Sequence, residues 1–155
     1  MTFRLTGLDR SQFASLFALD DAELTRRGVR RCVVDAKPGF PDRIELRDLE
    51  PGERALLLNY VHQPADTPFR ASHAIYVGEA STTTYDAIDR VPEAFRQRPM
   101  SLRAFDAEHM LRAAVLAEGD EVGPALAQLL DNPVHAYVHL HFARPGCYAA
   151  RAERA

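Results

Sequence analysis

The clearest hydrophobic pattern in the chain is a strict alternation over residues 134–142, which read VHAYVHLHF. A strand places successive side chains on opposite faces. This segment therefore predicts a strand with one apolar face in a core. The other face would carry three imidazoles and a phenol, from His135, Tyr137, His139 and His141. Half of the chain's six histidines would lie on that face.

Apolar positions elsewhere predict further short elements. We expect strands over residues 29–34, 43–46, 54–62, 71–77, 102–105 and 110–116, the last two paired, although the apolar pattern of 54–62 alone also allows a helix. We expect helices over residues 9–19, 20–28, 91–95 and 119–130. These short elements follow one another without a regular strand–helix–strand rhythm. The sequence thus predicts an α+β fold, a mainly antiparallel sheet with several short helices, and no doubly wound parallel sheet. With 155 residues and no linker or repeat, we expect a single compact domain over residues 1–155.

Composition restricts the classes of partner. The net charge of −3 argues against a nucleic-acid partner, which usually requires a basic stripe. No apolar run approaches the ~20 residues that cross a bilayer, so we expect no membrane partner. The motifs of dinucleotide-binding, P-loop and α/β-hydrolase proteins are missing. Cys32 and Cys147 form no paired motif, and residues 1–5 lack the apolar region of a signal peptide. We therefore expect a cytoplasmic protein with reduced cysteines.

Several distinctive blocks stand along the chain. They are VDAKPGFP (34–41), PGERALLLNY (51–60), HQP (62–64), TPFRAS (67–72), SLRAFD (101–106), VHLH (138–141) and GCYAAR (146–151). Together they resemble a bacterial family of single-domain proteins that is catalogued only as a domain of unknown function. The resemblance implies one compact bacterial domain, but no reaction and no catalytic residue. The chain departs from the family at one position, because Asp42 stands where we associate the block 34–41 with a following cysteine.

His139 and His141 are the candidate catalytic residues. They stand two positions apart on one strand face, roughly 6.5–7 Å apart at Cα, which lets both imidazoles converge on one metal ion. A catalytic zinc site needs a third protein ligand. The candidates for this ligand are His62, His73, His135, Asp106 and Cys147. The pattern identifies neither a metal nor any other cofactor, and the histidines could instead only bond their neighbours on a half-exposed sheet face.

The candidate ligand-binding residues are Arg70, Arg103, His62, Tyr60 and Tyr137. Together with His139 or His141, the arginines Arg70, Arg103 and Arg151 could clamp a carboxylate or phosphate bidentately, although surface ion pairing is the alternative. Arg70 and Arg103 are favoured because both lie in distinctive blocks. Tyr60 and His62 end a predicted strand, where polar residues often line a pocket mouth. If that strand and the histidine strand are neighbours, one aromatic–imidazole patch would continue across both.

Three hypotheses follow for the histidine face. In the first, it floors a pocket for a small anionic ligand, with general acid–base or metal-assisted chemistry. In the second, the chain is a non-catalytic interaction module that uses this face as a homodimer or partner surface. In the third, the face is structural and its histidines are held by internal hydrogen bonds. A nucleophilic Cys147 would need a base within reach, and a packed, inert thiol is the alternative.

Overall fold

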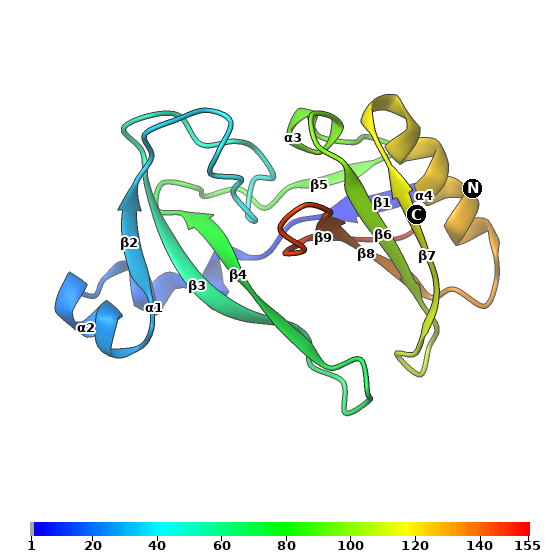
Figure 1. Ribbon diagram of the computed structural model, residues 1–155, viewed down its shortest axis with the longest axis horizontal. Helices are drawn as coiled ribbons and strands as arrows, with labels where there is room; N and C mark the ends of the chain where they lie inside the picture. Colours follow the sequence, from blue (N-terminus) through cyan, green and yellow to red (C-terminus); the bar gives the residue numbers. More distant parts are fainter. Residues whose placement is uncertain (1) are drawn as a thin grey trace.

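Two antiparallel sheets lie side by side in the computed structural model, which describes residues 2–155 (Figure 1). The strands are β1 (Phe3–Thr6), β2 (Arg30–Val33), β3 (Arg54–Gln63), β4 (Ala71–Gly78), β5 (Asp86–Ile88), β6 (Met100–Phe105), β7 (Leu111–Ala117), β8 (Tyr137–Phe142) and β9 (Tyr148–Arg154). The larger sheet has the order β5–β1–β9–β8–β6–β7, and the smaller has the order β2–β3–β4. This arrangement confirms the α+β class and the mainly antiparallel pairing, including the predicted β6–β7 pair.

Four short helices accompany the sheets: α1 (Ala14–Phe17), α2 (Asp21–Arg26), α3 (Glu93–Arg96) and α4 (Val122–Asp131). Helix α2 begins where the Asp20 side chain accepts a 2.8 Å hydrogen bond from the Glu23 N–H, and it ends before Gly28, which has a φ of +74°. The predicted helix over residues 9–19 is interrupted at Phe13, between a 3₁₀ turn (Arg10–Gln12) and α1. The Phe13 side chain at this interruption is buried in the core of the smaller sheet.

The predicted strand over residues 43–46 is wrong, because this segment is a turn. The Asp42 carboxylate closes the turn by accepting a 2.7 Å hydrogen bond from the Glu45 N–H, and Leu46 takes a φ of +55°. Asp42, which stands where the family resemblance suggests a cysteine, thus has a structural role here. Strands β1 and β5 were not predicted, since each is short and carries no continuous apolar pattern.

Strand β8 lies inside the larger sheet and is buried on both faces. Val138, Leu140 and Phe142 join the core that α4 covers. The opposite face carries Tyr137 and the two histidines and is turned toward the smaller sheet. The alternative of a half-exposed polar face does not hold, because side chains of the smaller sheet and of β9 cover it.

His135 does not belong to the histidine face. The strand begins only at Tyr137, and the His135 N–H instead closes a turn on the Asn132 carbonyl. The His135 ring Nδ1 lies 2.7 Å from the Leu129 carbonyl oxygen, at the end of α4. The predicted row of three imidazoles is therefore reduced to two on this strand.

Candidate functional site

Three imidazoles from two different sheets meet between them. His62 comes from β3, and His139 and His141 come from β8. One ring nitrogen of each lies within 4.8 Å of the others. Strands β3 and β8 are not paired, so the expected patch forms across the space between the sheets and not along one sheet. His73 lies outside this trio, with its ring centroid 6.5 Å from that of His62.

A bulge directs His62 toward the strand opposite. Along β3, Val61 pairs with Ser72 and Gln63 pairs with Ala71, which leaves His62 without a partner in the register. An unpaired extra residue bends a strand and re-aims its side chain, and such bulges are frequent next to functional sites. A second irregularity lies between β8 and β9 at His141. Both bulges thus occur at members of the trio.

Three ring nitrogens of the trio lack the hydrogen bonds that buried polar atoms normally make. Neither nitrogen of His62 has a partner among residues 2–155, nor has Nδ1 of His139, and all three atoms are buried. The His141 Nδ1–H donates to the Gly146 carbonyl oxygen over 2.9 Å, which leaves Nε2 as its unprotonated nitrogen. A backbone carbonyl is one of the usual acceptors for the second ring nitrogen of a metal-binding histidine, beside carboxylates and water.

Burial keeps the three imidazoles uncharged. Burial, assisted by the positive charge of Arg103, lowers the pKa of His62 to about 4 and those of His139 and His141 to about 3. A general acid or base at neutral pH works best with a pKa near 7, so these rings are poorly matched to proton transfer. Metals bind the neutral imidazole, so the same burial suits metal ligation.

Arg103 supplies a positive charge beside the trio. It lies on β6 directly opposite His139 in the register, so both side chains share one face. Its Nε–H donates to the Ser101 hydroxyl over 3.2 Å, and no carboxylate within residues 2–155 lies within 4.0 Å of it. Burial lowers the pKa of Arg103, yet guanidinium remains charged in proteins. The charge is therefore available to an anionic ligand.

Arg151 flanks His139 from the other neighbouring strand, β9. Its guanidinium lies 4.0 Å from the centre of the Tyr137 ring and 3.4 Å from the Glu153 carboxylate. Unlike Arg103, it is already engaged by an aromatic face and an acid. The sequence named Arg151, with Arg70 and Arg103, as an arginine that could clamp an anion beside His139 or His141, and the structure places it next to His139.

Tyr148 forms the aromatic wall of the site and was missed by the sequence reasoning. Its ring stacks on His62 with 5.2 Å between centroids and lies edge-on to His139 and His141 at 5.2 and 5.9 Å. Burial raises the pKa of its hydroxyl, so the phenol stays neutral. Its only signal in the sequence was membership of the block 146–151.

Tyr137 and Tyr60 have different surroundings. The Tyr137 hydroxyl accepts a 2.8 Å hydrogen bond from the Gln63 amide and lies 2.8 Å from His109 Nδ1, which ties β8 to the end of β3 beside His62. The Tyr60 ring packs in the apolar core, 6.0 Å from that of Tyr148. Tyr137 therefore helps to position the strands that carry the trio, whereas Tyr60 supports the trio only by packing near Tyr148.

The remaining sequence candidates are engaged elsewhere. Asp106 is paired with Arg112 at 2.5 Å, and the Cys147 sulfur accepts a hydrogen bond from the guanidinium of Arg43. Arg70 is exposed and donates to a backbone carbonyl of its own loop. No contact of Arg70 with the trio is found within residues 2–155. Of the proposed third ligands, the structure brings only His62 to the two histidines of β8.

We expect Tyr137→Phe to lower the free energy of unfolding by about 1–2 kcal/mol, because it leaves the buried Gln63 amide without its acceptor. Urea unfolding of the metal-free protein measures this change. The matched control is Tyr85→Phe, which removes an exposed 3.1 Å hydrogen bond to the Arg90 carbonyl and should change stability by less than about 0.5 kcal/mol. Equal effects of the two variants would contradict the positioning role of Tyr137.

Comparison with known proteins identifies the family but no activity. No match was found among curated proteins or among solved structures. Within residues 2–155, no helix has both the length and the apolar character needed to cross a membrane. The family described as "Protein of unknown function (DUF1203)" matches residues 39–154, a range that contains the whole trio, Arg103 and Tyr148. The chain therefore belongs to the DUF1203 family, as the resemblance of its sequence blocks indicated.

Proposed function

We propose that the protein binds one divalent transition-metal ion through His62, His139 and His141. The observation that carries this proposal is the convergence of three neutral imidazoles, with unpartnered buried nitrogens, from two separate sheets. In a tetrahedral zinc site, nitrogens bound at 2.0–2.1 Å stand roughly 3.4 Å apart. The trio nitrogens lie within 4.8 Å of one another, so ligation would require side-chain rotations that bring them closer together.

The ligand set favours zinc and leaves one position for another molecule. Imidazole suits zinc, copper, iron and nickel, whereas magnesium and calcium require oxygen ligands. Three protein ligands with an open fourth position are the arrangement of catalytic zinc. An ion bound in this way would polarise a carbonyl or phosphoryl oxygen, or activate a water molecule.

Arg103 favours an anionic ligand at the open fourth position of the metal ion. Its guanidinium has no acidic partner and lies on the same sheet face as His139, so it would pair with a carboxylate or phosphate. We therefore propose metal-assisted chemistry on a small anionic substrate, with Arg103 as its orienting residue. Arg70 is not part of this site. The cytoplasmic location expected from the sequence remains part of the proposal.

The interaction hypothesis receives no comparable support. Tyr137, His139 and His141 are 3%, 3% and 1% exposed within this chain, so a second copy could not contact them without separating the sheets. A homodimer through another surface stays a prediction. The structural hypothesis explains the contact between the rings, but it leaves three buried nitrogens without partners.

Cobalt(II) titration tests the proposed function, because the visible absorption of cobalt reports its ligands and coordination number. We expect saturation at one cobalt per chain, and we expect added phosphate or acetate to change the spectrum. In Arg103→Gln the cobalt should still bind, but the apparent affinity for the anion should fall about tenfold. This is the change in affinity that the loss of one charge-assisted hydrogen bond produces. Arg70→Gln is the matched control and should behave as the wild type. A featureless spectrum, or equal anion affinity in Arg103→Gln, would refute the proposal.

A further inference from the structure

A cavity of about 630 Å³ lies between the two sheets, separate from the imidazole trio. The turn at Gly146 lies between the cavity and the trio. The Gly146 carbonyl accepts the hydrogen bond of His141, while its α-carbon faces the ring of His73, which lines the cavity. The volume falls in the range of pockets that hold small organic ligands.

The lining of the cavity is strongly cationic. Arg43, Arg98 and Arg144 all contribute to it, and no aspartate or glutamate does, although acidic residues outnumber lysine and arginine in the chain as a whole. Arg98 is paired with Asp48 at 2.5 Å, outside the lining. Arg43 and Arg144 have no carboxylate within 4.0 Å among residues 2–155. Two of the three guanidiniums therefore have no ion-pair partner in the described part of the chain, although the carboxylate of Asp42 acts on Arg43 from a greater distance.

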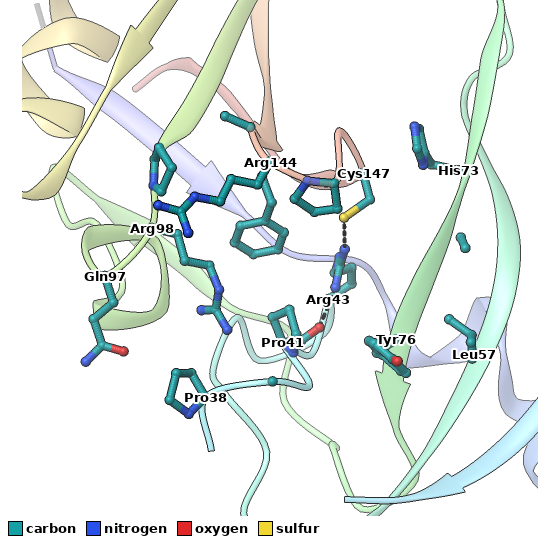
Figure 2. A pocket seen from close by; sticks show the side chains of 16 residues that line it. Pro38, Pro41, Arg43, Leu57, His73, Tyr76, Gln97, Arg98, Arg144 and Cys147 are labelled. Atoms are coloured by element: carbon teal, nitrogen blue, oxygen red, sulfur yellow. Dashed lines mark hydrogen bonds between the residues drawn. The ribbon is translucent and has the colours of Figure 1, made fainter. Parts of the chain in front are cut away.

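Arg43 is held rigidly beneath the cavity. It is 1% exposed, and it donates from Nε to the Tyr148 carbonyl over 2.8 Å, from Nη1 to the Pro41 carbonyl over 2.5 Å and from Nη2 to the Cys147 sulfur over 3.1 Å. Figure 2 shows the contact with Cys147. A buried, permanent charge is costly unless it is paired, and carbonyl dipoles and a sulfur balance it only in part. The positive potential of Arg43 therefore reaches into the cavity.

The two sides of the cavity differ in chemistry. Arg98 and Arg144 stand on the side of the larger sheet, whereas Leu57 and Tyr76 stand on the side of β3 and β4 (Figure 2). The Phe142 ring, also in the lining, lies 4.9 Å from the Arg43 guanidinium and 5.1 Å from that of Arg98. A ligand with an acidic group at one end and an apolar, planar body at the other would match both sides.

We propose that this cavity binds a small organic anion, a carboxylate or phosphate monoester with an aromatic or aliphatic body. Arg144 is exposed and makes no hydrogen bond within residues 2–155, so its planar guanidinium is free to form the bidentate pair with the acid. The buried Arg43 beneath the cavity attracts the acidic group electrostatically, and the side formed by Leu57 and Tyr76 contacts the body of the ligand. This site is distinct from the metal centre and does not depend on it.

Ligand-observed NMR titrations with benzoate, phenyl phosphate and benzyl alcohol test the site in the full chain. We expect both anions to bind and benzyl alcohol, which has a similar ring but no charge, to bind at least tenfold more weakly. Arg144→Gln should weaken both anions about tenfold, through the loss of one charge-assisted pair. Arg90→Gln, an equal change of charge at an exposed arginine outside the lining, should have no effect. Failure of both anions to bind, or unchanged affinity in Arg144→Gln, would overturn the proposal.

Alkylation of the two cysteines locates the bound anion. Cys147 lines the cavity, whereas Cys32 lies on β2 outside it and provides an internal reference. We expect saturating benzoate to slow the modification of Cys147 by iodoacetamide several-fold and to leave Cys32 unchanged, in the wild type and in Arg103→Gln alike. Equal rates with and without benzoate at Cys147, or protection lost in Arg103→Gln, would place the anion elsewhere and overturn the assignment.

Discussion

Replacing His141 by asparagine is expected to lower the affinity of the protein for zinc at least a hundredfold. The asparagine amide reaches about as far as Nδ1 of the imidazole, so it preserves a donor to the Gly146 carbonyl while it deletes Nε2. Loss of an outer-shell partner alone typically costs 10–100-fold in metal affinity, so loss of a ligand should cost more. Competition with a chromophoric chelator measures the affinity.

The control for this variant is His73→Asn. His73 is also a histidine near the site, but it lies outside the trio. Its replacement should change the zinc affinity by less than about threefold, since it removes no ligand. Urea unfolding of both metal-free variants checks that each retains the fold. Equal zinc affinity of His141→Asn and the wild type would show that the trio is a structural cluster.

Zinc is expected to stabilise the wild-type protein by about 2.7 kcal/mol when its free concentration is a hundred times the dissociation constant. For a domain of 155 residues this corresponds to a rise of roughly 5–10 °C in the midpoint of thermal unfolding. The stabilisation arises because the unfolded chain does not hold residues 62, 139 and 141 together, so the ion binds the folded state preferentially.

Two comparisons make the thermal experiment specific. Magnesium at the same concentration should leave the midpoint unchanged, because it prefers oxygen ligands to imidazole. His141→Asn should lose most of the zinc-dependent rise. A rise of the same size in His141→Asn, or with magnesium in the wild type, would indicate binding elsewhere on the surface and contradict the assignment.

The alternation over residues 134–142 identified His139 and His141 correctly as neighbours on one face, because the period of a strand fixes this relation. It misplaced His135, since the pattern does not show where the strand begins. It also gave no indication that the opposite sheet covers this face. That covering depends on contacts between segments about 80 residues apart, which local periodicity does not encode.

His62 was among the candidates for a third ligand, but the sequence could not select it. Its selection depends on the bulge in β3, which turns the side chain toward β8, and no residue type at positions 61–63 marks a bulge. The cationic cavity was equally hidden. Arg43 was placed on a short strand, whereas the structure puts it in a turn and buries its guanidinium against β9.

The metal content of the purified, untagged protein tests the central claim most directly. Native mass spectrometry with an elemental assay would count the ions bound per chain, before and after incubation with zinc. The account predicts close to one zinc, or one competing first-row ion, per chain in the wild type and none in the His139/His141 double variant. A wild-type protein that stays free of metal after incubation with excess zinc, or a double variant that retains a full equivalent, would contradict it.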